Sequence, residues 1–355
     1  MYRRYLKSII FPVVVFITWR ILIFLYQFFV QPNFIINEFS DTLVKRLFDG
    51  WTIYWDSSHY LSIAQNGYQY PEQAFFPLWP ILIKIFGFGS PTQITVYILT
   101  SSLNLITFVL FYIWAKKLGG VTRAKLALTT LVTFPSAMFF HAGYTENLYL
   151  SLTLLTFIFA EQGKFLLSSI FGGLVTATRV VGVSLVILQR KPQYFLIIGL
   201  GLVFYMLFLY FSYGDALIFG KAQQAWCQSA GRCGLTFPLL PLIDYGRLIL
   251  IGWIRPSLSI AFLDWFSTIM FLILLIPVYK NLKKSYFYYC LAVLILPLFS
   301  GSNAAMIRYV LAAYPVFYII PQVVKPKWLL VIMWILMFLL QMRFVGLFTS
   351  RMWVA

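Results

Sequence analysis

The sequence predicts an all-α polytopic membrane protein, folded as one bundle of about 11 transmembrane segments. Of its 355 residues, 61% are hydrophobic and only 10% are charged, whereas about a quarter of the residues in a soluble domain carry a charge. Apolar runs of about 20 residues, the length that a helix needs to cross the hydrocarbon core, recur along the chain. Because these runs follow one another closely, we expect residues 1–355 to form a single integral-membrane domain.

The predicted helices begin with a basic start, MYRRYLK, and an apolar run over residues 9–30. No small-residue cleavage site follows this run, so we expect the helix to be retained rather than removed as a signal peptide. A short amphipathic helix is predicted over residues 78–86. Longer apolar runs predict the helices 94–115, 124–139, 146–160, 195–212, 259–279, 286–300, 305–321 and 328–348.

The stretch between Lys164 and Arg190 is predicted to contain two short helices. Basic residues gather in cytoplasmic loops, which places both ends of this stretch on the cytoplasmic side. About 26 residues are too few for two full crossings at 1.5 Å per residue. Two short helices that meet near Arg179 and Gly182 satisfy both constraints.

The formal net charge of +17 comes from Lys and Arg clusters that lie between the apolar runs. Membrane topology explains such clusters, because cytoplasmic loops collect basic residues, and we expect no nucleic-acid partner. With the N-terminus in the cytoplasm, residues 31–90 form an extracytoplasmic first loop that carries short amphipathic helices. Residues 213–258 form a second extracytoplasmic loop.

Four polar stretches fall on the extracytoplasmic face of this predicted bundle. They are residues 51–76, FPSAMFFHAGYTENLY from Phe134, FSYGDALIFGKAQQAW from Phe211, and GSNAAMIRYVLAAYP from Gly301. The turn at Arg179 points to the same side. We therefore expect these stretches to gather into one pocket outside the cytosol.

Asp56 opens the predicted helix DSSHYLSIAQNG and has two interpretations that the sequence leaves open. Asp is a favoured N-cap residue, and Gly67 suits the C-terminal stop. A carboxylate at the membrane boundary can also accept a proton from a hydroxyl nucleophile. His59, one turn later, either binds a substrate phosphate or hydroxyl or bonds within the loop. The sequence has no His-rich or tight Asp-x-Asp ligand set, so we expect no metal and no other cofactor.

Arg179 and Arg308 lie inside apolar segments, where a lone Arg costs about 2.5–3.5 kcal/mol on insertion scales. Each therefore needs an anionic partner or a route to water. Two arginines directed at one external cavity suggest a phosphate, which Arg binds through a fork of donors. Snorkelling to lipid headgroups is the alternative.

Two further residues are candidates for sugar contacts. Glu146 is predicted to open a helix, where a first-turn acid complements the helix dipole; pairing with Arg179 or bonding a sugar hydroxyl is an additional role. Trp226 is either a platform for a sugar ring or part of an interfacial aromatic belt.

The three cysteines do not form a disulfide scaffold. Cys227 and Cys233 lie six apart in the second predicted loop, a spacing that leaves a small disulfide open. Cys290 lies in an apolar run, where we expect a buried small hydrophobe.

The polar stretches, taken together, resemble the GPI mannosyltransferase 2 (PIG-V) family. WDSSHYLSIAQNGY followed by AFFPLWP resembles the start of that family, and FPSAMFFHAGYTENLY resembles its Tyr-Thr-Glu segment. ATRVVG, YGDALIFGKAQQAW and IRYVLAAYP match later elements in the same order. The chain departs from the family where Val180 and Val181 precede Gly182, in place of Ser-Asn-Gly, and in lacking a eukaryotic-looking luminal insertion. These departures favour a prokaryotic relative, in a plasma membrane, with an acceptor other than the GPI precursor.

The resemblance implies an inverting glycosyltransferase of the GT-C type that uses a polyprenyl-phosphate sugar, usually mannose, with its active site on the extracytoplasmic face. Asp56 would be the general base that deprotonates the hydroxyl of a lipid-linked or glycan acceptor. Arg179 and Arg308 would hold the lipid phosphate that leaves. The sugar and acceptor site would be lined by His59, Tyr60, Glu146, Gln223 and Trp226.

Two other functional classes remain open from the sequence. A lipid or sugar transporter or flippase would place ionisable groups near the bilayer midplane and often shows inverted repeats, and the sequence shows no internal repeat. A non-catalytic subunit of a glycan-assembly complex would not need Asp56. A small membrane partner subunit also remains open.

Overall fold

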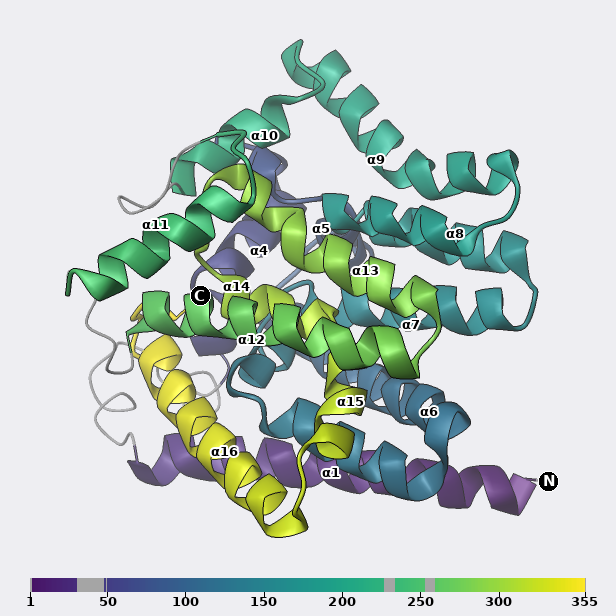
Figure 1. Cartoon of the computed structure of the whole chain (residues 1–355). Helices are drawn as coiled ribbons and strands as arrows, with labels where there is room; N and C mark the ends of the chain where they lie inside the picture. Colours follow the sequence, from purple (N-terminus) through teal and green to yellow (C-terminus); the bar gives the residue numbers. More distant parts are fainter. Residues whose placement is uncertain (1, 31–47, 49, 227–233, 253–258, 355) are drawn as a thin grey trace. The chain divides into compact units, whose positions relative to one another are not determined.

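The computed structural model describes residues 2–30, 48, 50–226, 234–252 and 259–354, and every regular element in these ranges is a helix (Figure 1). The chain divides into two compact units. The first comprises Met1–Gly67, Trp79–Leu154 and Phe317–Val354, and the second comprises Tyr68–Leu78 and Leu155–Val316. Each unit is thus assembled from segments that are far apart in sequence.

The first unit contains three long apolar helices that pack against one another: α1 (Tyr2–Val30), α6 (Gln93–Thr133) and α16 (Lys327–Thr349) (Figure 1). α6 is interrupted at Gly119 and Gly120, where the backbone leaves the helical region. Gly120 has a φ of 79°, which glycine adopts without steric cost. The unit also contains all or most of α4 (Asp56–Asn66), α5 (Leu78–Phe86), the 3-10 helix η2 (Pro135–Phe140) and α15 (Pro315–Val323), and the first half of α7 (Glu146–Glu161).

A buried glutamine joins three segments of this unit. The side-chain oxygen of Gln341, on α16, accepts a hydrogen bond of 2.9 Å from the Trp19 indole of α1. Its amide nitrogen donates to the carbonyl oxygens of Val132 and Phe134, at 3.0 and 2.7 Å. Because buried polar groups are costly unless they are hydrogen-bonded, these bonds fix α1, α16 and the end of α6 relative to one another.

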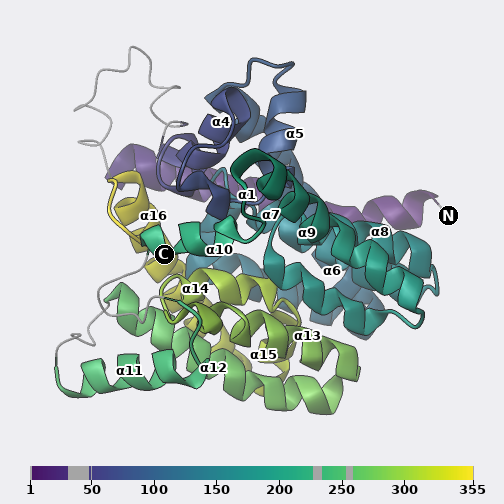
Figure 2. The ribbon, with the colours of Figure 1, turned by 90° about the horizontal axis from the view of Figure 1, so that it is seen from above.

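The second unit consists of shorter helices and helix pairs. Its elements are η1 (Glu72–Ala74), α8 (Phe165–Thr176), η3 (Val180–Leu188), α9 (Pro192–Tyr213), α10 (Ile218–Ala222), η4 (Gln223–Trp226), α11 (Leu239–Leu250), α12 (Ile260–Asn281), α13 (Lys284–Ile295), η5 (Pro297–Ser300), α14 (Met306–Tyr309) and η6 (Val310–Ala312). Figure 2 shows α8 and α9 side by side. Their backbones touch at Gly201, where a Cβ would overlap the carbonyl oxygen of Gly173 and lie 2.6 Å from the Thr176 hydroxyl.

Five helices of the described chain are long and apolar enough to cross a membrane: Ile9–Phe29 within α1, Gln93–Thr133, Pro192–Tyr213, Ile260–Asn281 and Lys327–Thr349. The count is six if the broken pair Met306–Ala312 and Pro315–Val323 forms one span. The predicted number of about 11 is therefore not confirmed. The predicted helical runs are nevertheless present, including the amphipathic Leu78–Phe86 and the two short helices on either side of Arg179.

Three predicted helices end earlier or break, and prolines explain each case. The predicted helix 124–139 ends at Thr133 because Phe134, before Pro135, is extended, as residues preceding proline tend to be. The predicted helix 286–300 ends at Ile295, just before Pro297. The predicted helix 305–321 is divided into α14, η6 and α15, the last of which begins at Pro315.

Candidate functional site

Asp56 occupies the first turn of α4 in the first unit. The helix ends before Gly67, whose φ of 81° confirms the predicted stop. The expected N-cap role of Asp56 is wrong by one residue, because the N-cap is Trp55 and Asp56 is already helical. Its backbone N–H donates to the Tyr144 hydroxyl at 3.3 Å. In the first turn, the carboxylate complements the positive end of the helix dipole.

Two further predicted site residues, His59 and Tyr60, follow Asp56 on α4. His59, one turn from Asp56, is half-buried, as Asp56 is. Tyr60 is 6% exposed and packs inward with the rest of the buried face. The carboxylate and the imidazole of this helix, Asp56 and His59, both remain partly accessible.

Two of the predicted polar stretches meet around Trp51 and Gly143. The Trp51 carbonyl accepts hydrogen bonds from the Ser57 hydroxyl at 3.0 Å and from the Gly143 N–H at 2.9 Å. The Gly143 carbonyl accepts from the Trp79 indole at 2.9 Å. A Cβ on Gly143 would lie 2.5 Å from a methyl group of Val96. The stretch with Asp56 and the stretch with Glu146 are thus held together by close backbone contacts.

Glu146 begins α7 as predicted and is buried, at 4% exposure. The next residue, Asn147, donates from its side-chain amide to the Phe140 carbonyl at 2.7 Å. The Asn147 carbonyl accepts from the Thr107 hydroxyl of α6 at 3.1 Å. These bonds fix the start of α7 and hence the position of Glu146.

Arg20 and His141 form a polar cluster in the first unit that sequence reasoning missed. An Arg20 guanidinium nitrogen lies 3.3 Å from the His141 Nε2 and 3.4 Å from the Tyr97 hydroxyl. His141 lies between Thr133 and Glu146, outside the candidate spans. Burial, with the Arg20 charge as a second cause, holds the pKa of His141 well below its ordinary 6.5. The one sign of this cluster in the sequence was Arg20 itself, a lone Arg inside the apolar run 9–30.

Arg179 and Arg308 come together in the second unit, at the ring of Tyr309. Their guanidinium carbons lie 5.6 and 5.2 Å from the centre of that ring. Arg179 is the N-cap of η3 and is half-buried, whereas Arg308, on α14, is 8% exposed. Two positive charges are therefore concentrated at one aromatic side chain.

Asp264 fixes the turn that carries Arg308, and sequence reasoning missed it as well. Its two carboxylate oxygens accept from the backbone N–H groups of Ala305, at 3.1 Å, and Ile307, at 2.8 Å. Ala305 has a φ of 63°, a left-handed conformation that a non-glycine residue rarely adopts. The signal in the sequence was a single Asp in the apolar run 259–279.

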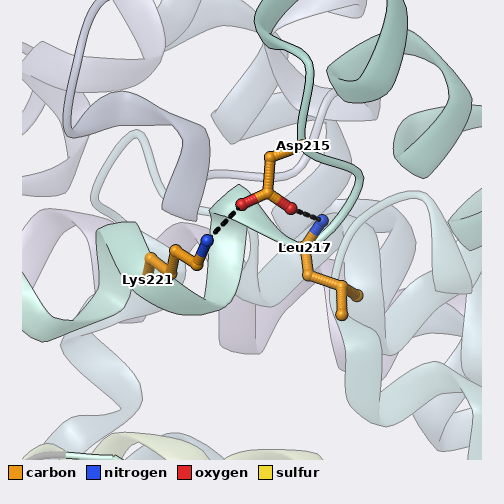
Figure 3. A network of polar contacts seen from close by, with 3 residues as sticks. All are labelled: Asp215, Leu217 and Lys221. Carbon is orange, nitrogen blue, oxygen red and sulfur yellow. Dashed lines mark hydrogen bonds and ion pairs between the residues drawn. The ribbon is translucent and has the colours of Figure 1, made fainter.

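In the second predicted loop, the Asp215 carboxylate binds Lys221 and accepts from the Leu217 N–H (Figure 3). The hydrogen bond from Lys221, and next that from Leu217, lower the pKa of Asp215. This network spans the start of α10. Gln223 is exposed beyond it, and Trp226 lies edge-on to Phe75, with ring centres 5.4 Å apart.

Among the described residues, no group of three or more His, Cys, Asp or Glu side chains is placed to hold a metal ion. Cys227 and Cys233 lie outside the described residues. Cys290 is buried as predicted.

Comparison with known proteins gives one family. The family described as Mannosyltransferase (PIG-V) matches residues 4–228. GPI alpha-1,6-mannosyltransferase 2 of Homo sapiens is 28% identical over 164 residues, which are 42% of this chain and 33% of the human protein. GPI mannosyltransferase pigv-1 of Caenorhabditis elegans is 25% identical over 145 residues, 36% of this chain and 21% of that protein. The matched stretch therefore spans a third or less of these relatives. No solved structure matches.

Proposed function

The chain belongs to the mannosyltransferase (PIG-V) family, and from that premise we propose that it is an inverting mannosyltransferase of the GT-C type. It transfers mannose from a polyprenyl-phosphate donor to a lipid-linked or glycan acceptor on the extracytoplasmic face of a membrane, as a step in glycolipid biosynthesis. The observation that carries the proposal is the family match over more than half of the chain, which includes both Asp56 and Arg179.

Asp56 is the general base in this proposal. Its carboxylate takes the proton of the acceptor hydroxyl while that oxygen attacks the anomeric carbon of the donor. The bond from the anomeric carbon to the phosphate oxygen breaks, and the polyprenyl phosphate leaves with the electron pair. One displacement inverts the anomeric centre, so no covalent sugar intermediate forms. The partial exposure of Asp56 at the border of α4 supports this role.

Arg179 and Arg308 bind the phosphate of the donor and stabilise the charge that develops as it leaves. Their shared position at the Tyr309 ring supports a joint role, because two guanidinium groups can contact different oxygens of one phosphate. Arg308 lies beyond the family match, so its assignment rests on this contact. His59, Tyr60, Glu146, Gln223 and Trp226 are the proposed sugar and acceptor contacts.

The experiment that tests this function supplies purified protein in lipid vesicles with radiolabelled polyprenyl-phosphate mannose and a membrane extract as the source of acceptor. Polyprenyl-phosphate glucose serves as the donor control. We expect the label to move from the mannose donor into a glycolipid or glycan product, in the inverted configuration. Donor binding without transfer would instead indicate a transporter or a non-catalytic subunit, and transfer with retention would contradict the single displacement.

A further inference from the structure

The residues at the end of α16 lie against the residues that immediately precede Asp56. Phe348, Arg351 and Trp353, the 348–353 segment, belong to the same unit as residues 51–55, although almost 300 positions separate them in sequence. Arg351 has a φ of 60°, which turns the chain back after the helix. This segment is outside the stretch matched by the family.

Phe348 supports the aromatic residues around the start of α4. Its ring stacks on Trp51, with centres 5.4 Å apart and an interplanar angle of 27°. It also contacts Tyr144 at 6.0 Å. Trp51 accepts a bond from Ser57 of α4, and Tyr144 accepts the N–H of Asp56. Phe348 thus contacts Trp51 and Tyr144, the two residues that accept hydrogen bonds from Ser57 and Asp56 at the start of α4.

Arg351 and Trp353 contact Tyr54 and Trp55, the two residues that immediately precede Asp56. An Arg351 guanidinium nitrogen donates to the Tyr54 hydroxyl at 2.8 Å, and the guanidinium carbon lies 4.5 Å from the centre of the Tyr54 ring. The Trp353 ring lies edge-on to Trp55, with centres 5.5 Å apart. Tyr54 and Trp55 therefore each have a partner in the 348–353 segment.

Trp55 has a φ of 55° and directly precedes Asp56. A bulky residue rarely adopts this left-handed conformation, and such strain persists only where the surrounding structure over-determines it. The contact with Trp353 on one side and the bond from Asp56 N–H to Tyr144 on the other provide that constraint. If Trp55 relaxed to an ordinary φ, the first turn of α4, and with it the Asp56 carboxylate, would change direction.

We infer that Arg351 and Trp353 are positioning residues for the general base Asp56. The inference rests on the proposed function, since it assigns these residues to the same reaction. Both side chains are exposed, Trp353 by 36%, so truncating them does not open a cavity in the buried core. Catalysis is far more sensitive than stability, because a displacement of about 1 Å can cost about a hundredfold in rate.

The test is a double-mutant cycle with Arg351→Ala, Tyr54→Phe and the double variant, together with Trp353→Ala and Trp353→Phe, all in the full chain. Each is assayed for mannose transfer, and its melting temperature is measured. We expect kcat to fall about tenfold or more in the alanine variants, with KM for donor and acceptor changed less than about twofold. The double variant should be no slower than Arg351→Ala, since Arg351 and Tyr54 contact each other. Trp353→Phe, which keeps an aromatic ring, should retain most of the rate that Trp353→Ala loses.

Arg343→Ala and Trp328→Ala are the matched controls, because both residues are exposed on α16, the helix that leads into the 348–353 segment. They should transfer mannose at the wild-type rate. If wild-type protein is active and the Arg351 and Trp353 variants match it, or lose rate only in proportion to lost melting temperature, the inference is wrong and the proposed function stands. If wild-type protein transfers no sugar, the proposed function itself fails, and this inference fails with it.

Discussion

At the residue scale, the protonation state of His141 is decided by its surroundings. The imidazole is 6% exposed and lies beside a guanidinium group. Both burial and a neighbouring positive charge disfavour the imidazolium, which accounts for the lowered pKa. The neutral ring accepts from Arg20 through Nε2, so its proton is on Nδ1. Folding therefore selects one protonation state and one tautomer.

This lowered pKa predicts that the folded protein is less stable in mild acid. Above pH 6.5 His141 is neutral in both the folded and the unfolded chain, and its contribution is fully present. Below pH 6.5 the unfolded chain binds a proton that the folded chain does not, so stability falls, by at most about 1.4 kcal/mol per pH unit. Melting temperatures in detergent from pH 8 to pH 5 would measure this. His141→Gln should flatten the profile relative to wild type, and parallel profiles would contradict the assignment.

A second prediction at this scale concerns the arginines at Tyr309. Arg179→Ala should raise KM for the polyprenyl-phosphate donor about tenfold or more, because a charge-assisted contact to phosphate is lost. Arg179→Lys should recover only part of the loss, since Lys lacks the planar fork. Arg190→Ala removes an exposed arginine at the other end of η3 and is the matched control. Equal donor KM values for the Arg179 and Arg190 variants would remove Arg179 from the phosphate site.

At the scale of elements, the contact between α8 and α9 depends on the absence of a side chain at Gly201. A Cβ there meets backbone atoms, which cannot move aside as a flexible side chain can. Gly201→Ala should therefore destabilise the protein by roughly 1–3 kcal/mol, the range of overpacking. Gly199→Ala, on the same helix, meets no atom within 4 Å and is the control. A melting temperature lowered by the first substitution and not by the second is the expected result, and equal values would show that the helices are not in close contact.

The elements themselves were largely predictable from the sequence. Apolar runs locate the long helices, and glycine at residues 67, 119 and 120 marks where a helix stops or breaks. Prolines were the main source of error, because a hydrophobic run such as 305–321 was taken as continuous although Pro315 lies within it. Hydrophobicity predicts that a segment is buried or crosses lipid, whereas backbone geometry decides how far each helix continues.

At the scale of the whole molecule, the polar stretches were predictable from the sequence, whereas the buried polar contacts within and around them were not. The sequence identified Asp56, Arg179 and Arg308 as unusual in an apolar chain. It did not identify Asp264 or His141, since their roles depend on bonds to residues about 40 and 120 positions away. Two of the four polar stretches meet at Trp51 within the first unit. Gathering of all four into one pocket stays a prediction.

The measurement that tests the central claim most directly is the single-turnover rate of mannose transfer by Asp56→Asn at saturating donor and acceptor. The amide keeps the size of the side chain and cannot accept the proton, so we predict a loss of at least about a hundredfold, with an unchanged melting temperature. Asp215→Asn, which alters a half-buried carboxylate in the second loop, should transfer mannose at the wild-type rate. A wild-type rate from Asp56→Asn would contradict the account.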